Sequence, residues 1–134
     1  MSQTDNFPTA VSMQQCLEKG QCGPSVSDFV GRTGLMLLGL SLAGAKNPLP
    51  KALAASASVQ AFVAGWVLVE GNTRLPSGIA AQQGELPSIV YTYLARSAIA
   101  SVGLSLSGQS DRLVVDSLAA VAPIEAAVLL WSYK

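Results

Sequence analysis

The residues most capable of chemistry are ionisable side chains that stand within apolar stretches of the chain. Arg96 lies near the middle of the apolar segment 89–106, and Glu125 lies slightly past the middle of the segment 113–133. If both segments are helices running in opposite directions, a rise of about 1.5 Å per residue puts the two side chains at nearly the same depth. We therefore expect an ion pair, which could act as a proton or substrate relay or could fix the register of two helices.

The first half of the chain offers a similar arrangement with less charge compensation. Arg32 and Gln60 occupy the matching places in two earlier apolar segments. Glutamine carries no charge, so this second polar pair leaves its arginine without a full counter-charge. A further acid, Asp116, follows Arg112 by four residues, and we expect these two to form a local surface pair.

Cys16 and Cys22 stand in the stretch QQCLEKGQCG, before the first apolar segment. Their spacing is neither CxxC nor a recognised metal pattern, and the loop could close into a disulfide, while two free thiols and a redox-active pair are the alternatives. The chain has no His, and no nucleophile–base pair, phosphate loop or metal cluster can be assembled from its residues. The sequence therefore predicts a non-catalytic protein, and it indicates no cofactor and no metal.

Composition favours a membrane environment over water. Half of the 134 residues are hydrophobic and only 12% are charged, whereas soluble domains carry about a quarter of charged residues. Eight basic and eight acidic residues cancel, and no basic cluster is interleaved with aromatic residues, so nucleic-acid binding is not expected. The polar segment 1–25 lacks the apolar core of a cleavable signal, and we expect it to be an N-terminal tail.

Four apolar segments, separated by breakers and charges, indicate four helices. They run over about 26–44, 52–69, 89–106 and 113–133. The second is uncharged and long enough to cross a hydrocarbon core of roughly 30 Å. These segments predict an all-α membrane domain over 26–134.

A repeat relates the two halves of this predicted domain. GLSLAG at 39–44 returns as GLSLSG at 103–108, and the match extends in both directions with an offset of 64, then 65, residues. We therefore expect a four-helix transmembrane bundle built from two tandem-repeated helical hairpins, over about 26–70 and 88–133. One hairpin cannot bury its own inner face, whereas two hairpins can.

Small residues at four-residue spacing are candidates for close helix packing in lipid. They are Ala57, Ala61 and Gly65 in the second segment, and Ser97, Ser101 and Ser105 in the third. Three aromatic residues toward one membrane side, Trp66, Trp131 and Tyr133, fit an interfacial belt.

Membrane orientation is nearly undetermined by the sequence. Basic residues outside the predicted helices are balanced on the two sides, three on each, so the positive-inside rule does not decide. The acid-free connector AKNPLPK at 45–51 and the possible disulfide favour termini on the non-cytoplasmic side.

The stretch VQAFVAGWVLVEGNTR at 59–74 resembles the second helix of the DoxX-like family of small four-helix membrane proteins. The matching positions are Gln60, Ala64, Gly65, Leu68, Thr73 and Arg74, and the first helix is matched by Arg32, Gly44 and Lys46. The resemblance covers about the first half of the chain. It implies a four-helix bundle of a kind associated with sulfur or thiol redox systems, although Gln60 replaces the family's usual carboxylate.

Three functions follow from these observations. The leading hypothesis is a small integral membrane protein that is an accessory or assembly subunit of a larger membrane complex, with lipid and other membrane subunits or copies of itself as partners. The second is a small transporter or redox-partner membrane subunit that uses the Arg96–Glu125 pair. The third is a helical coat or pilus-type subunit, because such proteins are also apolar and rich in Ala, Ser and Gly.

Overall fold

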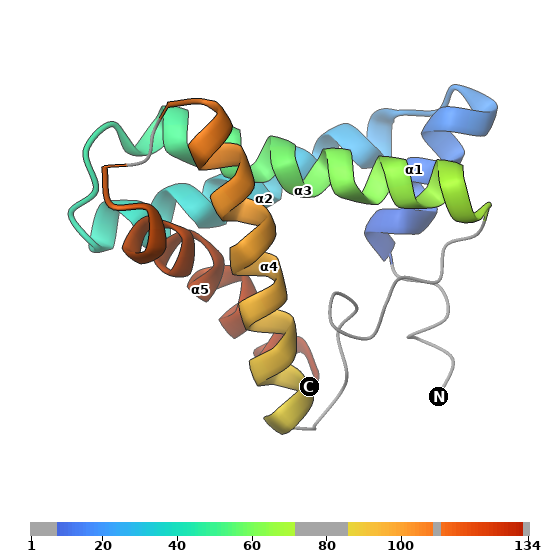
Figure 1. Cartoon of the computed structure of the whole chain (residues 1–134). Coiled ribbons are helices and arrows are strands. Elements are labelled where there is room, and N and C mark those ends of the chain that lie inside the picture. Colours follow the sequence, from blue (N-terminus) through green and yellow to red (C-terminus); the bar gives the residue numbers. More distant parts are fainter. Residues whose placement is uncertain (1–7, 72–85, 109–110, 133–134) are drawn as a thin grey trace.

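The computed structural model describes residues 8–71, 86–108 and 111–132, which form five helices packed together (Figure 1). The all-α fold class is confirmed. The helices are α1 (Pro8–Lys19), α2 (Gly23–Leu42), α3 (Pro48–Glu70), α4 (Leu86–Leu106) and α5 (Leu113–Ser132).

The ends of the helices follow from local sequence. Both α2 and α3 have a proline in their first turn, where the missing N–H costs nothing. Two turns with the same geometry follow α2 and α4. Gly44 and Gly108 have φ angles of +74° and +78°, and their N–H groups donate to the carbonyls of Ser41 and Ser105. Glycine adopts this left-handed conformation without strain.

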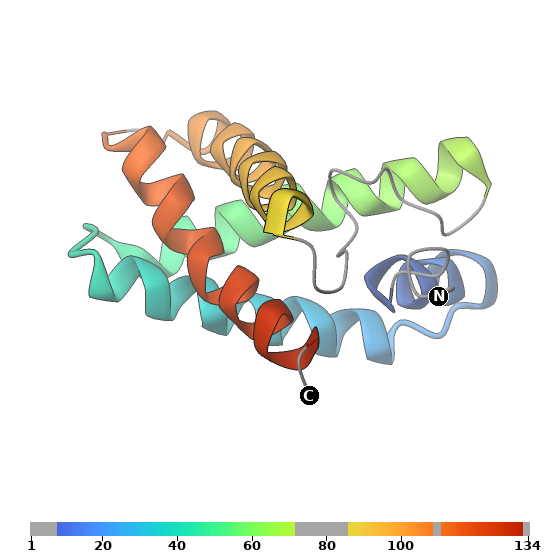
Figure 2. The same cartoon turned by 90° about the horizontal axis from the view of Figure 1, so that it is seen from below.

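Helices α2 to α5 form a ring of four in which each helix packs on two neighbours. Extensive contacts join α2 with α3, α3 with α4, α4 with α5, and α5 with α2, whereas α3 and α5 barely touch. Figures 1 and 2 show the α2–α3 and α4–α5 hairpins close together near their two connectors and diverging away from them. The two hairpins are therefore closer to each other at the connector end than at the other.

Two apolar clusters form the core. The central one joins all four helices of the ring and contains Met36, Leu40, Ala52, Ala55, Ala100, Ala120 and Val121. The other fixes α1, because Ala10 and Met13 pack against Val63 and Val67 near the end of α3.

The segment predicted to be a polar tail contains helix α1, so the expected number of four helices was too low. Half of the residues of α1 are polar, and the buried apolar residues among its described side chains are Ala10 and Met13. Such a short apolar side gives a weak periodic signal. A helix of this kind is held by its contacts with α2 and α3 rather than by its own propensity.

Close helix packing occurs at glycines that the predicted small-residue stripes do not include. A Cβ built at Gly39 would lie 2.0 Å from the carbonyl oxygen of Ala119, and one at Gly103 would lie 2.4 Å from that of Ala54. Only the absence of a side chain allows these approaches of α2 to α5 and of α4 to α3.

The predicted stripes point mostly elsewhere, which corrects that interpretation. Ala57 and Ala61 are exposed, and nothing lies within 4 Å of a Cβ built at Gly65. On α4, Ser97 is buried, but Ser101 is only partly buried and Ser105 is exposed. Four-residue spacing defines a stripe along a helix without defining which stripe faces the neighbour.

Two helices, Pro48–Glu70 and the Leu113–Leu130 part of α5, are long and apolar enough to cross a membrane. This assignment rests on length and composition alone. In each, 28% of the most apolar stretch is buried inside the structure, whereas a core helix of a soluble protein would be mostly buried.

Candidate functional site

Arg96 and Glu125 meet between α4 and α5. Arg96 Nη1 donates to Glu125 Oε1 over 2.9 Å, and the hydroxyl of Thr92 donates to Glu125 Oε2 over 2.6 Å. All three residues are buried. Both carboxylate oxygens are thus engaged, and the pair ties the register of α4 to that of α5.

Arg32 forms the matching centre between α2 and α3. Its Nε donates to Ser56 Oγ over 3.2 Å, its Nη1 to Asp28 Oδ2 over 3.1 Å, and its Nη2 to Gln60 Oε1. The Gln60 amide then donates to Ser25 Oγ over 2.7 Å. The structure therefore brings the predicted Arg32–Gln60 pair together and adds three polar partners.

The two centres differ in where their negative charge lies. Glu125 is 8% exposed, so Arg96 faces a buried carboxylate. Arg32 is 9% exposed, but Asp28, its carboxylate partner among the described residues, is 38% exposed. Its other two side-chain partners, the buried Ser56 and the partly buried Gln60, are neutral. Water screens an exposed carboxylate, so the charge of Arg32 is less fully balanced.

A cavity of about 410 Å³ lies between these two centres. Side chains from α2, α3, α4 and α5 line it, and most of them are apolar. Arg32, Arg96 and Asp28 are also among the residues that line it. Its volume falls within the range of roughly 300–1,000 Å³ that holds small-molecule ligands.

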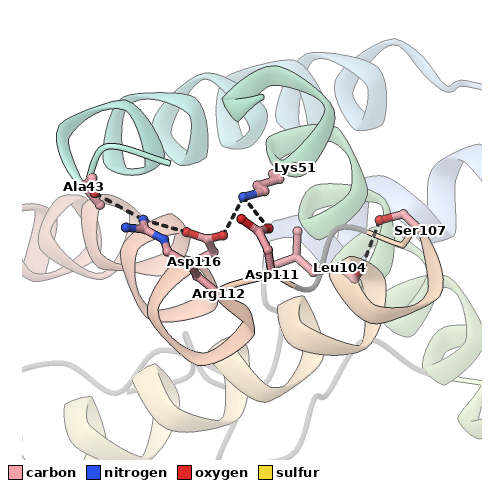
Figure 3. A network of polar contacts seen from close by, with 7 residues as sticks. All are labelled: Ala43, Lys51, Leu104, Ser107, Asp111, Arg112 and Asp116. Atoms are coloured by element: carbon pink, nitrogen blue, oxygen red, sulfur yellow. Dashed lines mark hydrogen bonds and ion pairs between the residues drawn. The ribbon is translucent and has the colours of Figure 1, made fainter. Parts of the chain in front are cut away.

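A second polar network joins the two hairpins at their connectors (Figure 3). Lys51 Nζ on α3 contacts Asp116 Oδ2 on α5 at 2.7 Å and Asp111 Oδ1 at 3.0 Å. Arg112 contacts the other oxygen of Asp116 at 2.9 Å and donates to the carbonyl of Ala43 over 3.2 Å. The network thus connects the end of α2 and the start of α3 with the start of α5.

This network corrects the prediction of a local surface pair at Arg112 and Asp116. The two residues do pair, but Asp116 is 0% exposed, and Lys51 is 1% exposed inside α3 rather than in a connector. One sequence signal could have found it, because the repeat offset of 65 residues places Lys51 and Asp116 at corresponding positions.

In the loop before α5, the network shifts the pKa of Asp111. The hydrogen bond from Lys51, with its positive charge, lowers the pKa of the Asp111 carboxyl from its ordinary value of 3.8. Asp111 therefore stays ionised in mildly acidic solution.

Cys16 and Cys22 form a disulfide that joins α1 to the start of α2. Of the three alternatives that the sequence leaves open, the structure contains this one. Trp66 is partly buried and stacks with Phe62. The side chains of Trp131 and Tyr133, the other two residues of the predicted aromatic belt, lie outside the described set.

Comparisons of the chain with protein-family models, curated proteins and solved structures found no match. The resemblance to the DoxX-like family therefore stays a prediction.

Proposed function

We propose that the protein is a small integral membrane protein in which α2 to α5 all cross the bilayer. The main observation in support is that charged side chains are buried while large apolar side chains are exposed, which is the opposite of the usual arrangement in a soluble protein. Among the residues that the structure describes, five charged ones are buried, namely Arg32, Lys51, Arg96, Asp116 and Glu125. Charged residues are almost never fully buried in soluble proteins unless they are paired, and charges inside membrane bundles likewise face protein. These paired charges support the membrane proposal because they occur together with an apolar outer surface.

The outer surface supports the same proposal. Leu42, Val69 and Leu106 are each about 80% exposed, at 79%, 81% and 83%, and exposed large apolar side chains occur on all four helices of the ring. A surface of this kind in water marks an interaction site. In a membrane it faces lipid tails or a neighbouring subunit.

We further propose that the bundle arose from two copies of one hairpin related by a pseudo-two-fold axis. Its support is a set of reciprocal contacts at matching positions. Gly39 packs on Ala119 of the second copy, and its counterpart Gly103 packs on Ala54, the counterpart of Ala119 in the first. Lys51 and its counterpart Asp116 contact each other.

The best-supported role is a non-catalytic accessory or assembly subunit of a larger membrane complex. The buried charged side chains contact side chains on neighbouring helices, as Arg32, Arg96, Glu125 and Asp116 do. Contacts of this kind fix the register of the helices. The exposed apolar surface is available to membrane partners or to further copies of the chain.

Fractionation of the expressed protein tests this proposal. Carbonate washes should leave it in the membrane, and a neutral detergent should release it with a native mass far above 13.8 kDa. Release without detergent as polymers would contradict the proposal and favour a coat or pilus subunit. A detergent-solubilised monomer would contradict the subunit role while leaving the membrane assignment intact.

Cysteine labelling tests the topology separately. In a background of Cys16→Ser and Cys22→Ser, the single variants Asn47→Cys, Ser107→Cys and Gly71→Cys report on the ends of the helices. Asn47 and Ser107 should be labelled from one side of the membrane, and Gly71 from the other. Labelling of all three from the same side would exclude a spanning α3.

A small transporter is the second candidate, because the buried Arg96–Glu125 pair lies beside the cavity. Flux of a solute or of protons in liposomes, lost in Glu125→Gln and retained in Glu70→Gln, would favour it. Glu70 is an exposed residue at the end of α3 and provides the matched control.

A further inference from the structure

We propose that the cavity lined by α2, α3, α4 and α5 binds a single-chain amphipathic anion. Arg32 would hold its carboxylate, and its apolar chain would fill the cavity. This inference goes beyond the subunit role and does not depend on it.

The head group is indicated by Arg32, whose carboxylate partner Asp28 has a partly exposed side chain. A guanidinium has five N–H donors in a planar fork, and Ser56, Asp28 and Gln60 each accept one hydrogen bond from it. Donor capacity therefore remains at a buried charge whose carboxylate partner, Asp28, has a side chain that is 38% exposed. Arginine binds carboxylates in two-pronged geometry, so an anion there would supply the counter-charge that Glu125 supplies to Arg96.

The tail is indicated by the wall of the cavity. Met36, Phe62 and Ile124 come from three different helices and give the wall its apolar character, together with Leu35. A chain of methylene groups gains free energy along such a wall in proportion to the apolar area removed from water. A volume of about 410 Å³ suits one chain, whereas a two-chain lipid would leave a chain outside.

Asp28 should affect anion binding in the opposite direction to Arg32. It lines the cavity and accepts a hydrogen bond from Arg32, so it competes with a bound carboxylate for the same guanidinium and repels that carboxylate. Removing its charge should therefore strengthen anion binding, whereas a merely apolar ligand would be indifferent to it.

The test measures binding of decanoate, decanol and decyltrimethylammonium to the full-length protein in a neutral detergent. Decanoate should bind most tightly. Arg32→Gln should weaken it by about tenfold to a hundredfold, the range expected for a charge-assisted hydrogen bond, while Asp28→Asn should tighten it. Lys19→Gln, which removes a positive charge from the exposed end of α1, should have no effect.

A second pair of variants tests the place of binding without changing charge. Ala127 lies on the cavity wall and is exposed, so Ala127→Trp should block entry and abolish decanoate binding. Its neighbour Ala126 is also exposed and does not line the cavity, so Ala126→Trp should bind as the unchanged protein does. Unchanged helicity and elution volume would show that each variant is folded.

Three results would overturn the proposal. Equal binding of decanoate and decanol would remove the anionic head group. Binding that survives Ala127→Trp would remove the cavity. Displacement of decanoate by phosphatidylglycerol but not by other single-chain carboxylates would assign Arg32 to a lipid head group instead.

Discussion

Replacement of Asp116 by asparagine should destabilise the protein more than any other single change in the connector network. Asp116 is 0% exposed, and its two oxygens face Lys51 at 2.7 Å and Arg112 at 2.9 Å. Removing one partner of a buried ion pair costs about 3–5 kcal/mol, because the remaining charge is left without compensation. Lys51 keeps its 3.0 Å contact with the half-exposed Asp111, so we expect a loss near the lower end, about 3 kcal/mol.

The matched control is Asp111→Asn, which removes the other carboxylate from the same ammonium group. Asp111 is 50% exposed, and exposed ion pairs contribute about 1 kcal/mol or less. Both variants replace one carboxylate oxygen by an amide NH₂ group and remove one negative charge. The comparison therefore isolates the effect of burial, and it is made by denaturant unfolding of the protein in neutral detergent.

A double variant distinguishes the loss of the attraction between Lys51 and Asp116 from the cost of leaving Lys51 charged and buried without its partner. Lys51→Met together with Asp116→Leu removes both buried charges and should recover much of the stability that Asp116→Asn loses. The reasoning would be refuted if Asp116→Asn and Asp111→Asn cost the same, or if the double variant were less stable than Asp116→Asn alone.

Three further predictions concern other parts of the molecule. Gly39→Ala should cost about 1–3 kcal/mol or more, because its methyl group would meet the α5 backbone, whereas Gly65→Ala should be neutral or stabilising; equal unfolding midpoints would contradict this. Because Lys51 lowers the pKa of Asp111 below 3.8, that carboxylate stabilises the fold above about pH 4 and ceases to do so as the pH falls through the lowered pKa. The stability difference between the wild type and Asp111→Asn should vanish in acid, and a pH-independent difference would exclude the contact. Cys16→Ser should cost about 2 kcal/mol, seen as faster hydrogen exchange confined to α1.

The sequence predicted those features that follow from periodicity and depth. Arg96 and Glu125 were expected to meet because they lie at similar depths in two apolar segments, and they contact each other in the structure. Depth along a helix is readable from residue counting. The repeat puts Arg32 and Gln60 at the corresponding positions of the first hairpin, and these two side chains also contact each other.

Rotation about a helix axis is much harder to read. The stripe Ala57–Ala61 has the composition of a packing face, but its residues are exposed, and the face one residue earlier, including Ala52, Ala55 and Ser56, is buried. In a helix as apolar as α3, both the packed face and the outer face are apolar. The difference in polarity that normally distinguishes a buried face from an exposed one is therefore small. Polar residues carry the remaining information, and Ser56 beside Arg32 is an example.

The buried charges are consequently the best guide to how the helices associate. Each helix of the ring has apolar residues on its inner and outer faces, so apolar packing alone would tolerate several rotations of each helix. The ion pairs would not, because Arg96 must reach Glu125 and Lys51 must reach Asp116. A rotation that separates either pair strands a charge at a cost of several kcal/mol. The two glycine contacts then bring the backbones to the distance at which these pairs close. Polar pairs and glycines together therefore select one arrangement from the many that hydrophobicity alone would allow.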